Sequence, residues 1–171
     1  KGHSNTRDRI FGEIADRVIR HAPCDILLLK IGETAKMENC LFPTAGGPNA
    51  KIASTVLNAM AKESDFSVTA GYILPEDALS RQEEDGMRRM EDTLTDLEPT
   101  ITCKRELIKS KTVAGGIASA SRSYDLVVIG AAKEPFFRKM LFGEIPEKVA
   151  RYSPTSVLLV KRYEGVVKSL L

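Results

Sequence analysis

The chain has few cysteines, and they are not grouped as a disulfide framework or a metal site requires. Cys24, Cys40 and Cys103 are odd in number, lie far apart and form no C-x-x-C pair. A structural zinc site and a set of disulfides are therefore both disfavoured. A reducing, cytoplasmic compartment fits this cysteine usage best.

Long apolar runs and a strong excess of one charge are also missing. The longest apolar run covers the four residues from Ile26 to Leu29, far short of the roughly 20 that a membrane span requires. The formal net charge of +2 does not indicate a nucleic-acid-binding surface. Because the chain begins at Lys1 without an initiator methionine or a signal-peptide pattern, we expect a piece of a longer protein.

Residue patterns typical of catalysis are not recognisable either. The sequence has only two histidines, His3 and His21, and it contains no nucleophile elbow, metal-ligand cluster or Ser-His-Asp set. We therefore expect that the protein is not an enzyme. No catalytic residue and no metal ligand is assigned.

What the sequence does contain is an internal repeat. Residues 11–30, the N-terminal copy, align without gaps to residues 142–161, the C-terminal copy, and ten of the twenty positions are identical. Average residue usage would give about one or two identities by chance, so the repeat indicates a duplication. In each copy, apolar residues at helical spacing precede a proline and a short apolar run. We therefore expect a helix followed by a strand in both.

Upstream of the C-terminal copy, apolar strands alternate with amphipathic helices. One helix is expected to bury a stripe of Met87, Met90, Leu94 and Leu97. Strands are expected near residues 40–43, 66–74, 101–108, 126–129 and 157–160.

This order predicts the fold class and the place of a ligand. It indicates an α/β fold with an open, doubly wound, parallel sheet of five strands and helices on both faces. The N-terminal copy would add a helix and a strand that remain from a preceding domain of the same kind. Ligands of such folds bind beyond the carboxyl ends of the strands, here near residues 43–47 and 130–144.

Several of these segments resemble the universal stress protein family. Residues 125–130, Gly143 and residues 149–160 are similar to the carboxyl third of its domain, and residues 42–46 to its first strand and turn. The likeness extends over about residues 39–162, and it implies an adenine nucleotide alpha hydrolase-like fold. The chain then divides into a remnant of a first domain (1–31), a complete domain (38–162) and a C-terminal tail (163–171).

The resemblance also identifies candidate nucleotide-binding positions. Members that bind ATP carry glycine, two residues, glycine, nine residues, glycine, then serine or threonine. Gly130 and Gly143 match this motif, but Lys133 replaces the middle glycine, Glu144 replaces the hydroxyl residue, and Ala45 replaces an acidic residue near the ribose. The full candidate set is Pro43, Thr44, Ala45, Gly46, Gly130, Lys133, Gly143 and Glu144, with Gly2, Gly12 and Glu13 as what remains of the motif in the N-terminal copy.

These departures from the motif disfavour ATP. A carboxylate about 4 Å from a phosphate repels it by about 1 kcal/mol in water, and by several times that in a less solvated cleft. Lys133 would offset part of this repulsion. AMP, another adenine nucleotide or no nucleotide at all remain open. Gly130 and Gly143 can equally be required by the backbone alone, and Glu144 can simply favour the positive end of a helix.

Two hypotheses for the function follow from the resemblance. Tandem copies with altered phosphate loops resemble those at the carboxyl ends of amino-acid permeases and cation/proton antiporters. The first hypothesis is therefore a regulatory or interaction domain at the cytoplasmic face of the membrane, with a transporter membrane domain as partner. The alternative is a free-standing cytosolic stress protein that binds AMP or ATP. The sequence does not identify a transported solute or a sensed signal.

The last strand of the predicted sheet has a consequence of its own. It lies at an edge, and an apolar edge strand invites another strand to pair with it. The resemblance implies that universal stress protein domains pair through this strand, within one molecule or between two. We therefore expect an antiparallel pairing within this chain between Ile26, Leu27, Leu28 and Leu29 and the run Val157, Leu158, Leu159 and Val160.

Overall fold

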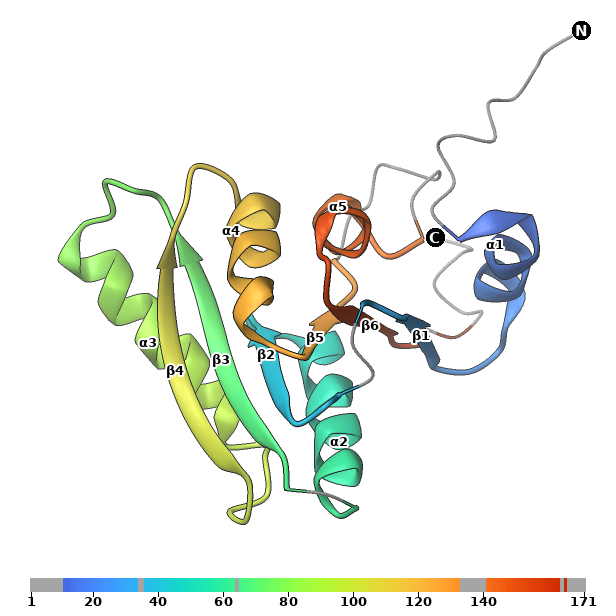
Figure 1. Ribbon diagram of the computed structural model, residues 1–171, viewed down its shortest axis with the longest axis horizontal. Helices are drawn as coiled ribbons and strands as arrows, with labels where there is room; N and C mark the ends of the chain where they lie inside the picture. The colour runs from blue at the N-terminus through green and yellow to red at the C-terminus, as the bar shows by residue number, and fades with distance from the viewer. Residues whose placement is uncertain (1–10, 34–35, 64, 133–140, 164, 166–171) are drawn as a thin grey trace, which may run out of the picture.

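The computed structural model describes residues 11–33, 36–63, 65–132, 141–163 and 165. Its centre is a six-stranded sheet with the order β1-β6-β5-β2-β3-β4 (Figure 1). Neighbouring strands are parallel except for the antiparallel pair β1 and β6, so the predicted α/β fold with five parallel strands is confirmed. The strands are β1 (Ile26–Lys30), β2 (Asn39–Pro43), β3 (Ser67–Leu74), β4 (Thr102–Lys109), β5 (Leu126–Gly130) and β6 (Ser156–Lys161).

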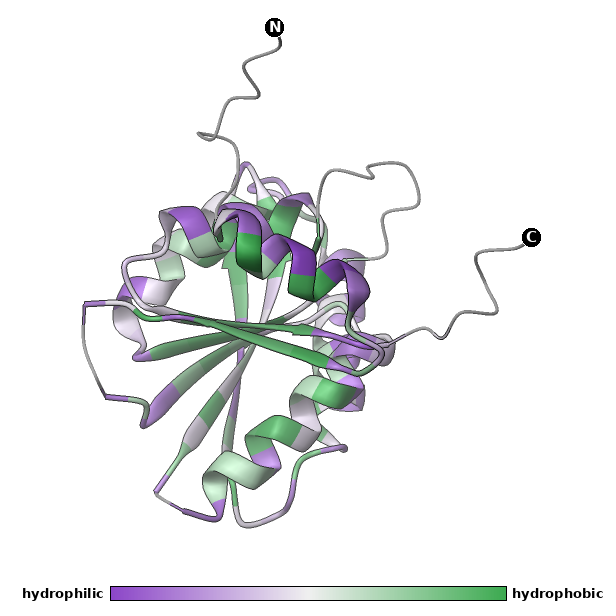
Figure 2. Cartoon of the chain, turned by 90° about the vertical axis from the view of Figure 1, so that its right-hand side faces the viewer, coloured by the Kyte–Doolittle hydropathy of each residue, from purple (hydrophilic) through white to green (hydrophobic). Residues whose placement is uncertain are grey.

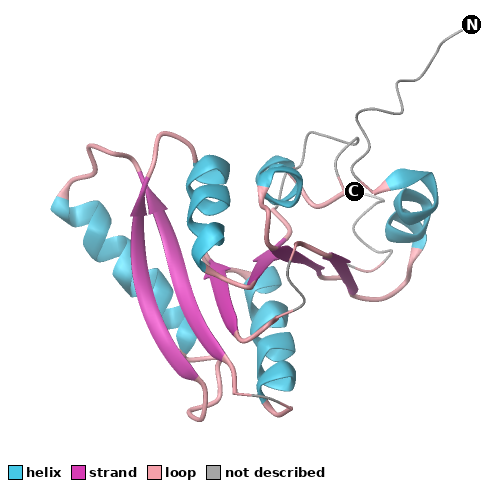
Figure 3. Cartoon of the chain, viewed as in Figure 1, coloured by secondary structure: helices cyan, strands magenta, loops and turns pink. Residues whose placement is uncertain are grey.

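Helices cover both faces of this sheet (Figure 3). One apolar cluster joins α2 to one face of β2, β5 and β6, and a second joins α1, α4 and α5 to the other face. Apolar strands lie in the middle of the molecule, and the helices turn polar sides outward (Figure 2). The helices are α1 (Gly12–His21), α2 (Pro48–Ala61), α3 (Ser80–Leu94), α4 (Val113–Ala120) and α5 (Glu144–Tyr152), with a 3-10 turn at Ser121–Ser123.

The buried stripe expected along α3 is present except at its first position. Met90 is fully buried, Leu94 packs against the core, and Leu97, just after the helix, is nearly buried, but Met87 is 41% exposed. A Cβ added at Gly86 would lie 2.6 Å from the ring of Tyr72, so α3 lies close against the sheet at this glycine. Gly86 therefore takes the place expected of Met87 at this end of the stripe.

The pairing of β1 with β6, expected from the sequence, is present within the chain and has an internal two-fold symmetry. Leu28 pairs with Leu159, which is its own equivalent in the other copy. The two ends of the ladder repeat the same hydrogen bond. The backbone N–H of Gly32 donates to Ser156 Oγ at 3.0 Å, and that of the equivalent Tyr163 donates to Asp25 Oδ1 at 2.8 Å.

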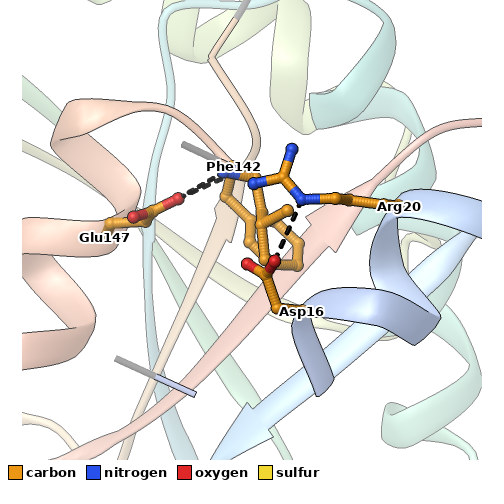
Figure 4. A network of polar contacts seen from close by, with 5 residues as sticks. Asp16, Arg20, Phe142 and Glu147 are labelled. Atoms are coloured by element: carbon orange, nitrogen blue, oxygen red, sulfur yellow. Dashed lines mark hydrogen bonds and ion pairs between the residues drawn. The ribbon is translucent and has the colours of Figure 1, made fainter. Parts of the chain in front are cut away.

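The two copies also meet through their helices. The buried ring of Phe142 contacts Phe11, its equivalent, edge to face with ring centres 6.1 Å apart. Glu147 of α5 accepts a hydrogen bond from the backbone N–H of Phe142 at 3.1 Å, while Asp16 and Arg20 of α1 form an ion pair on the other side (Figure 4). Equivalent residues thus face each other as in an isologous contact between two subunits. None of the helices in the described part of the chain has the length and apolarity that a membrane crossing requires.

Candidate functional site

A cavity of about 320 Å³ opens beyond the carboxyl ends of the parallel strands. It lies where β2 and β5 are neighbours, and their following connections leave toward opposite faces of the sheet. This is the position at which doubly wound sheets bind ligands. Of the residues predicted for the site, the structure brings Pro43, Thr44, Ala45, Gly46 and Gly130 together in its wall.

Two helix N-termini border the cavity. Gly47 is the N-cap of α2 and Gly143 is the N-cap of α5, both with φ of 99°, and neither has a side chain to bind the first N–H groups of its helix. Residues of the first turn of each helix, Asn49 and Ile145, line the cavity. Helix N-termini carry a partial positive charge and favour an anion.

Two prolines limit how many N–H groups these helices can offer. Pro48 is the first residue of α2, and Pro146 is the third residue of α5. Proline has no backbone N–H to donate. The site therefore has fewer donors for a polyphosphate than two uninterrupted helix starts would supply.

The hydroxyl of Thr44 holds the turn rather than facing a ligand. It accepts a hydrogen bond from the N–H of Gly46 and contacts the hydroxyl of Thr93 on α3, both at 3.0 Å. Thr93 Oγ1 donates to the carbonyl of Arg89 at 2.9 Å, so Thr44 must be the donor to Thr93. Arg89 in turn donates to the carbonyl of Ala45 at 3.2 Å. The carbonyl of Ala45 is thus held by Arg89, and Ala45, whose side chain is only a methyl group, lines the cavity.

Gly130 is required by packing at the end of β5. A Cβ there would lie 2.8 Å from Cβ of Asn49, too close for two carbon atoms. Asn49 Nδ2 donates to the carbonyl of Ala131 at 2.7 Å, and its Oδ1 accepts from the N–H of Arg162 at 2.9 Å. Asn49 thus ties the start of α2 to the ends of β5 and β6. A polar residue directly after Pro48 was the only sequence signal for this role.

The other predicted positions lie at or beyond the edge of the cavity. Gly143 needs its positive φ to start α5, and an added Cβ would also lie 2.8 Å from Ala132. The carboxylate of Glu144 is half-exposed and forms an ion pair with Lys148, which raises the pKa of Lys148. Gly12, which also has a positive φ, and Glu13 are the first two residues of α1, whose N-cap is Phe11. Lys133 and Gly2 fall outside the described residues.

The remaining walls of the cavity are mostly apolar and were not predicted. The predicted site residues lie on two connections, whereas the cavity is also lined by residues of β3 and of α4. These additional lining residues include Gly71, Tyr72, Ile73, Val113, Ile117, Ile129 and Ile145.

No Asp, Glu, Lys, Arg or His is among the residues that line the cavity in the described part of the chain. Three groups whose pKa is raised by burial lie outside the lining of the cavity. They are Cys40 within β2, Cys103 in β4 and Tyr124 before β5. Within the described ranges, no cluster of side chains could hold a metal ion. The described part of the cavity is suited to hold a ligand, and it contains no carboxylate, amine, guanidinium or imidazole group.

Comparison with known proteins agrees with this architecture. Residues 37–161 match the universal stress protein family. The chain belongs to this family. No curated protein matches it.

Solved structures of the family share the fold. A universal stress protein from Archaeoglobus fulgidus in complex with dAMP is 13% identical, with a TM-score of 0.60, over 75% of this chain and all of the other. A universal stress protein in complex with cAMP is 16% identical, with a TM-score of 0.57, over 71% of this chain and 95% of the other. Another, from Archaeoglobus fulgidus DSM 4304, is 17% identical, with a TM-score of 0.65, over 90% of this chain but only 55% of its own.

Proposed function

We propose that the domain is a regulatory module that binds an adenine nucleoside or mononucleotide, AMP being the model ligand, and does not use ATP. The observation that carries this proposal is the cavity at the carboxyl ends of β2 and β5. It combines apolar walls with the N-termini of α2 and α5 and is lined by no ionised side chain in its described part.

The walls and the rim suit the two ends of such a ligand. Aliphatic side chains from Ile73, Val113 and Ile117 provide a surface for a planar base. The helix N-terminus at Gly143 favours a single phosphate by its partial charge. The cavity volume of about 320 Å³ is at the small end of the range for ligand pockets. Family members solved with dAMP and cAMP support the same ligand class.

A triphosphate is a poorer fit than a single phosphate for two reasons. Pro146 removes an N–H from the first turn of α5. Glu144 places a negative charge at the start of the same helix, where Lys148 compensates only part of it. Additional phosphates would gain few donors and meet this carboxylate.

Titration calorimetry tests the proposal. We expect AMP to bind, and ATP with Mg²⁺ to bind at least about tenfold more weakly, a difference of about 1.4 kcal/mol. Val113→Trp would fill the cavity and should abolish AMP binding, because Val113 lines it and is 42% exposed. The matched control is Val18→Trp, at an exposed valine of α1. The proposal is wrong if neither AMP nor adenosine binds, or if ATP binds more tightly than AMP.

The larger context of the domain is a second part of the proposal. We propose that it belongs to a tandem pair at the cytoplasmic face of a membrane transporter, either an amino-acid permease or a cation/proton antiporter. The internal repeat and the symmetric contact between its copies support a tandem origin. A free-standing cytosolic protein is the alternative. The complete reading frame decides between them, because the transporter form requires ten or more apolar spans upstream.

A further inference from the structure

The N-terminal copy leaves uncovered the positions that the C-terminal copy buries. On the helices, Val18 of α1 is 58% exposed, whereas its equivalent Val149 of α5 is fully buried. Ile14 of α1 is 83% exposed, whereas its equivalent Ile145 of α5 is partly buried and lines the cavity. The residue types are the same in both copies, so the difference lies in what surrounds them. An apolar helix face of this kind is normally covered.

The strand of the N-terminal copy shows the same difference. Leu27 and Leu29 of β1 are 51% and 42% exposed, whereas their equivalents Leu158 and Val160 of β6 are 8% exposed and fully buried. In the described part of the chain β1 is the end of the sheet, so its second edge has no partner strand. An apolar face of α1, an apolar face of β1 and the free edge of β1 are thus all uncovered.

The C-terminal copy shows what covers these positions in a finished domain. Val149 packs in one cluster with Ile117 of α4 and Val127 of β5. Leu158 and Val160 pack in the other cluster, which contains Leu57 of α2. One parallel strand and one helix on each face therefore enclose the α5–β6 unit.

The two-fold symmetry of the β1–β6 pair shows where equivalent elements would lie. The axis passes between Leu28 and Leu159. Rotation about it keeps an element on the same face of the sheet, since the equivalent helices α1 and α5 lie on the same face (Figure 1). An equivalent of α2 would then lie beside α2 itself. An apolar groove of about 580 Å³ is present there, lined by Leu27, Met37, Val56, Ala59 and Met60 among others.

We propose that these uncovered surfaces of α1 and β1 dock the body of a second universal stress protein fold, encoded ahead of α1 in the same polypeptide. Its strand equivalent to β5 adds in parallel to the free edge of β1. Its helices equivalent to α2 and α4 cover Leu27 and Leu29 on one face and Ile14 and Val18 on the other. This inference rests on the tandem origin proposed above and adds the surfaces and elements through which the first domain is completed.

Cysteine labelling in two forms of the protein tests the inference. The 171-residue chain is compared with the product of the same reading frame extended upstream by about one domain length. Both carry Cys24→Ser and Cys103→Ser to remove the exposed thiols, while Cys40 is buried. The probes are Val18→Cys and Leu29→Cys. The control is Met87→Cys, because Met87 is exposed to a similar extent on the distant α3.

In the 171-residue chain we expect both probes to react with a maleimide about as fast as the control. In the extended protein, both probes should react at least about tenfold more slowly while the control is unchanged. The inference is overturned if the extended protein leaves the probes reactive, or if the reading frame encodes no strand–helix pattern upstream. It is also overturned if the 171-residue chain protects the probes when concentrated, since a second copy would then occupy the surface. Circular dichroism confirms that each variant is folded, and AMP titration of the extended protein tests nucleotide binding separately.

Discussion

Two identical residues at equivalent positions of the repeat allow a matched test of burial. Val149 of α5 is fully buried, and Val18 of α1 is 58% exposed. Both lie within a helix of similar length and sequence, so Val→Ala makes the same chemical change in two environments. The free energy of unfolding should respond very differently.

The magnitude follows from the buried methyl groups. Val149→Ala removes two of them from a packed site, at about 0.8 kcal/mol each, and leaves a cavity that adds to the cost. The better helix propensity of alanine returns up to about 0.7 kcal/mol. The net loss should be about 2 kcal/mol. For Val18→Ala the smaller loss of buried apolar surface is nearly cancelled by the better helix propensity of alanine. The free energy of unfolding should therefore change by no more than about 0.5 kcal/mol.

Urea unfolding followed by circular dichroism measures both changes. Val149→Ala should lower the midpoint without changing the slope, and should lower the melting temperature by about 4–8 °C. Val18→Ala should leave both quantities nearly unchanged. Equal losses for the two variants would show that Val18 is covered in solution. A negligible loss for Val149→Ala would contradict the packing of α5 against α4 and β5.

Three further predictions concern other parts of the chain. Gly32→Ala should weaken the attachment of β1 and lower the melting temperature, because an added Cβ would lie 2.4 Å from the backbone N of Ser156. The control Glu33→Ala should leave the melting temperature unchanged. Equal melting temperatures for the two variants would contradict this packing. Burial raises the pKa of Cys40 far above its ordinary value, so the unfolded chain loses this proton first. The contribution of Cys40 to the free energy of unfolding should therefore be full below about pH 8.5, and at higher pH this free energy should fall by up to about 1.4 kcal/mol per pH unit. Urea unfolding at several pH values should show a less steep fall in Cys40→Ala. An unchanged dependence on pH in that variant would exclude this cause. Combining Lys133→Gly with Glu144→Ser should increase ATP affinity in calorimetry if charge and backbone access are the obstacles, and an unchanged affinity would instead implicate the missing carboxylate at Ala45.

The predicted strands and helices were largely correct because local chemistry specifies them. The continuous apolar run from Leu126 to Ile129 is what a strand buried on both faces requires. Proline at Pro23 and at Pro154 ends the preceding helix in each copy. Met87 was wrongly placed in the buried stripe of α3 because the contact between Gly86 and Tyr72 joins segments far apart in sequence.

The candidate site was predicted only in part. Pro43, Ala45 and Gly46 could be placed because ligand sites of this fold follow the ends of neighbouring strands. The roles of Thr44 and Gly130 could not be, since they depend on Thr93 and Asn49, which tertiary packing brings beside them. The apolar walls from β3 and α4 were missed for the same reason.

The sequence by itself determined the alternation of strands and helices and the repeat, because these depend on residue periodicity and residue identity. The antiparallel pairing of the two apolar runs was expected from the resemblance to the family. The tertiary structure alone decided that Leu28 meets its own equivalent, Leu159, and that the same valine is buried in α5 and exposed in α1. Exposure depends on neighbours from distant parts of the chain, and identical local sequences carry no information about which neighbours are present.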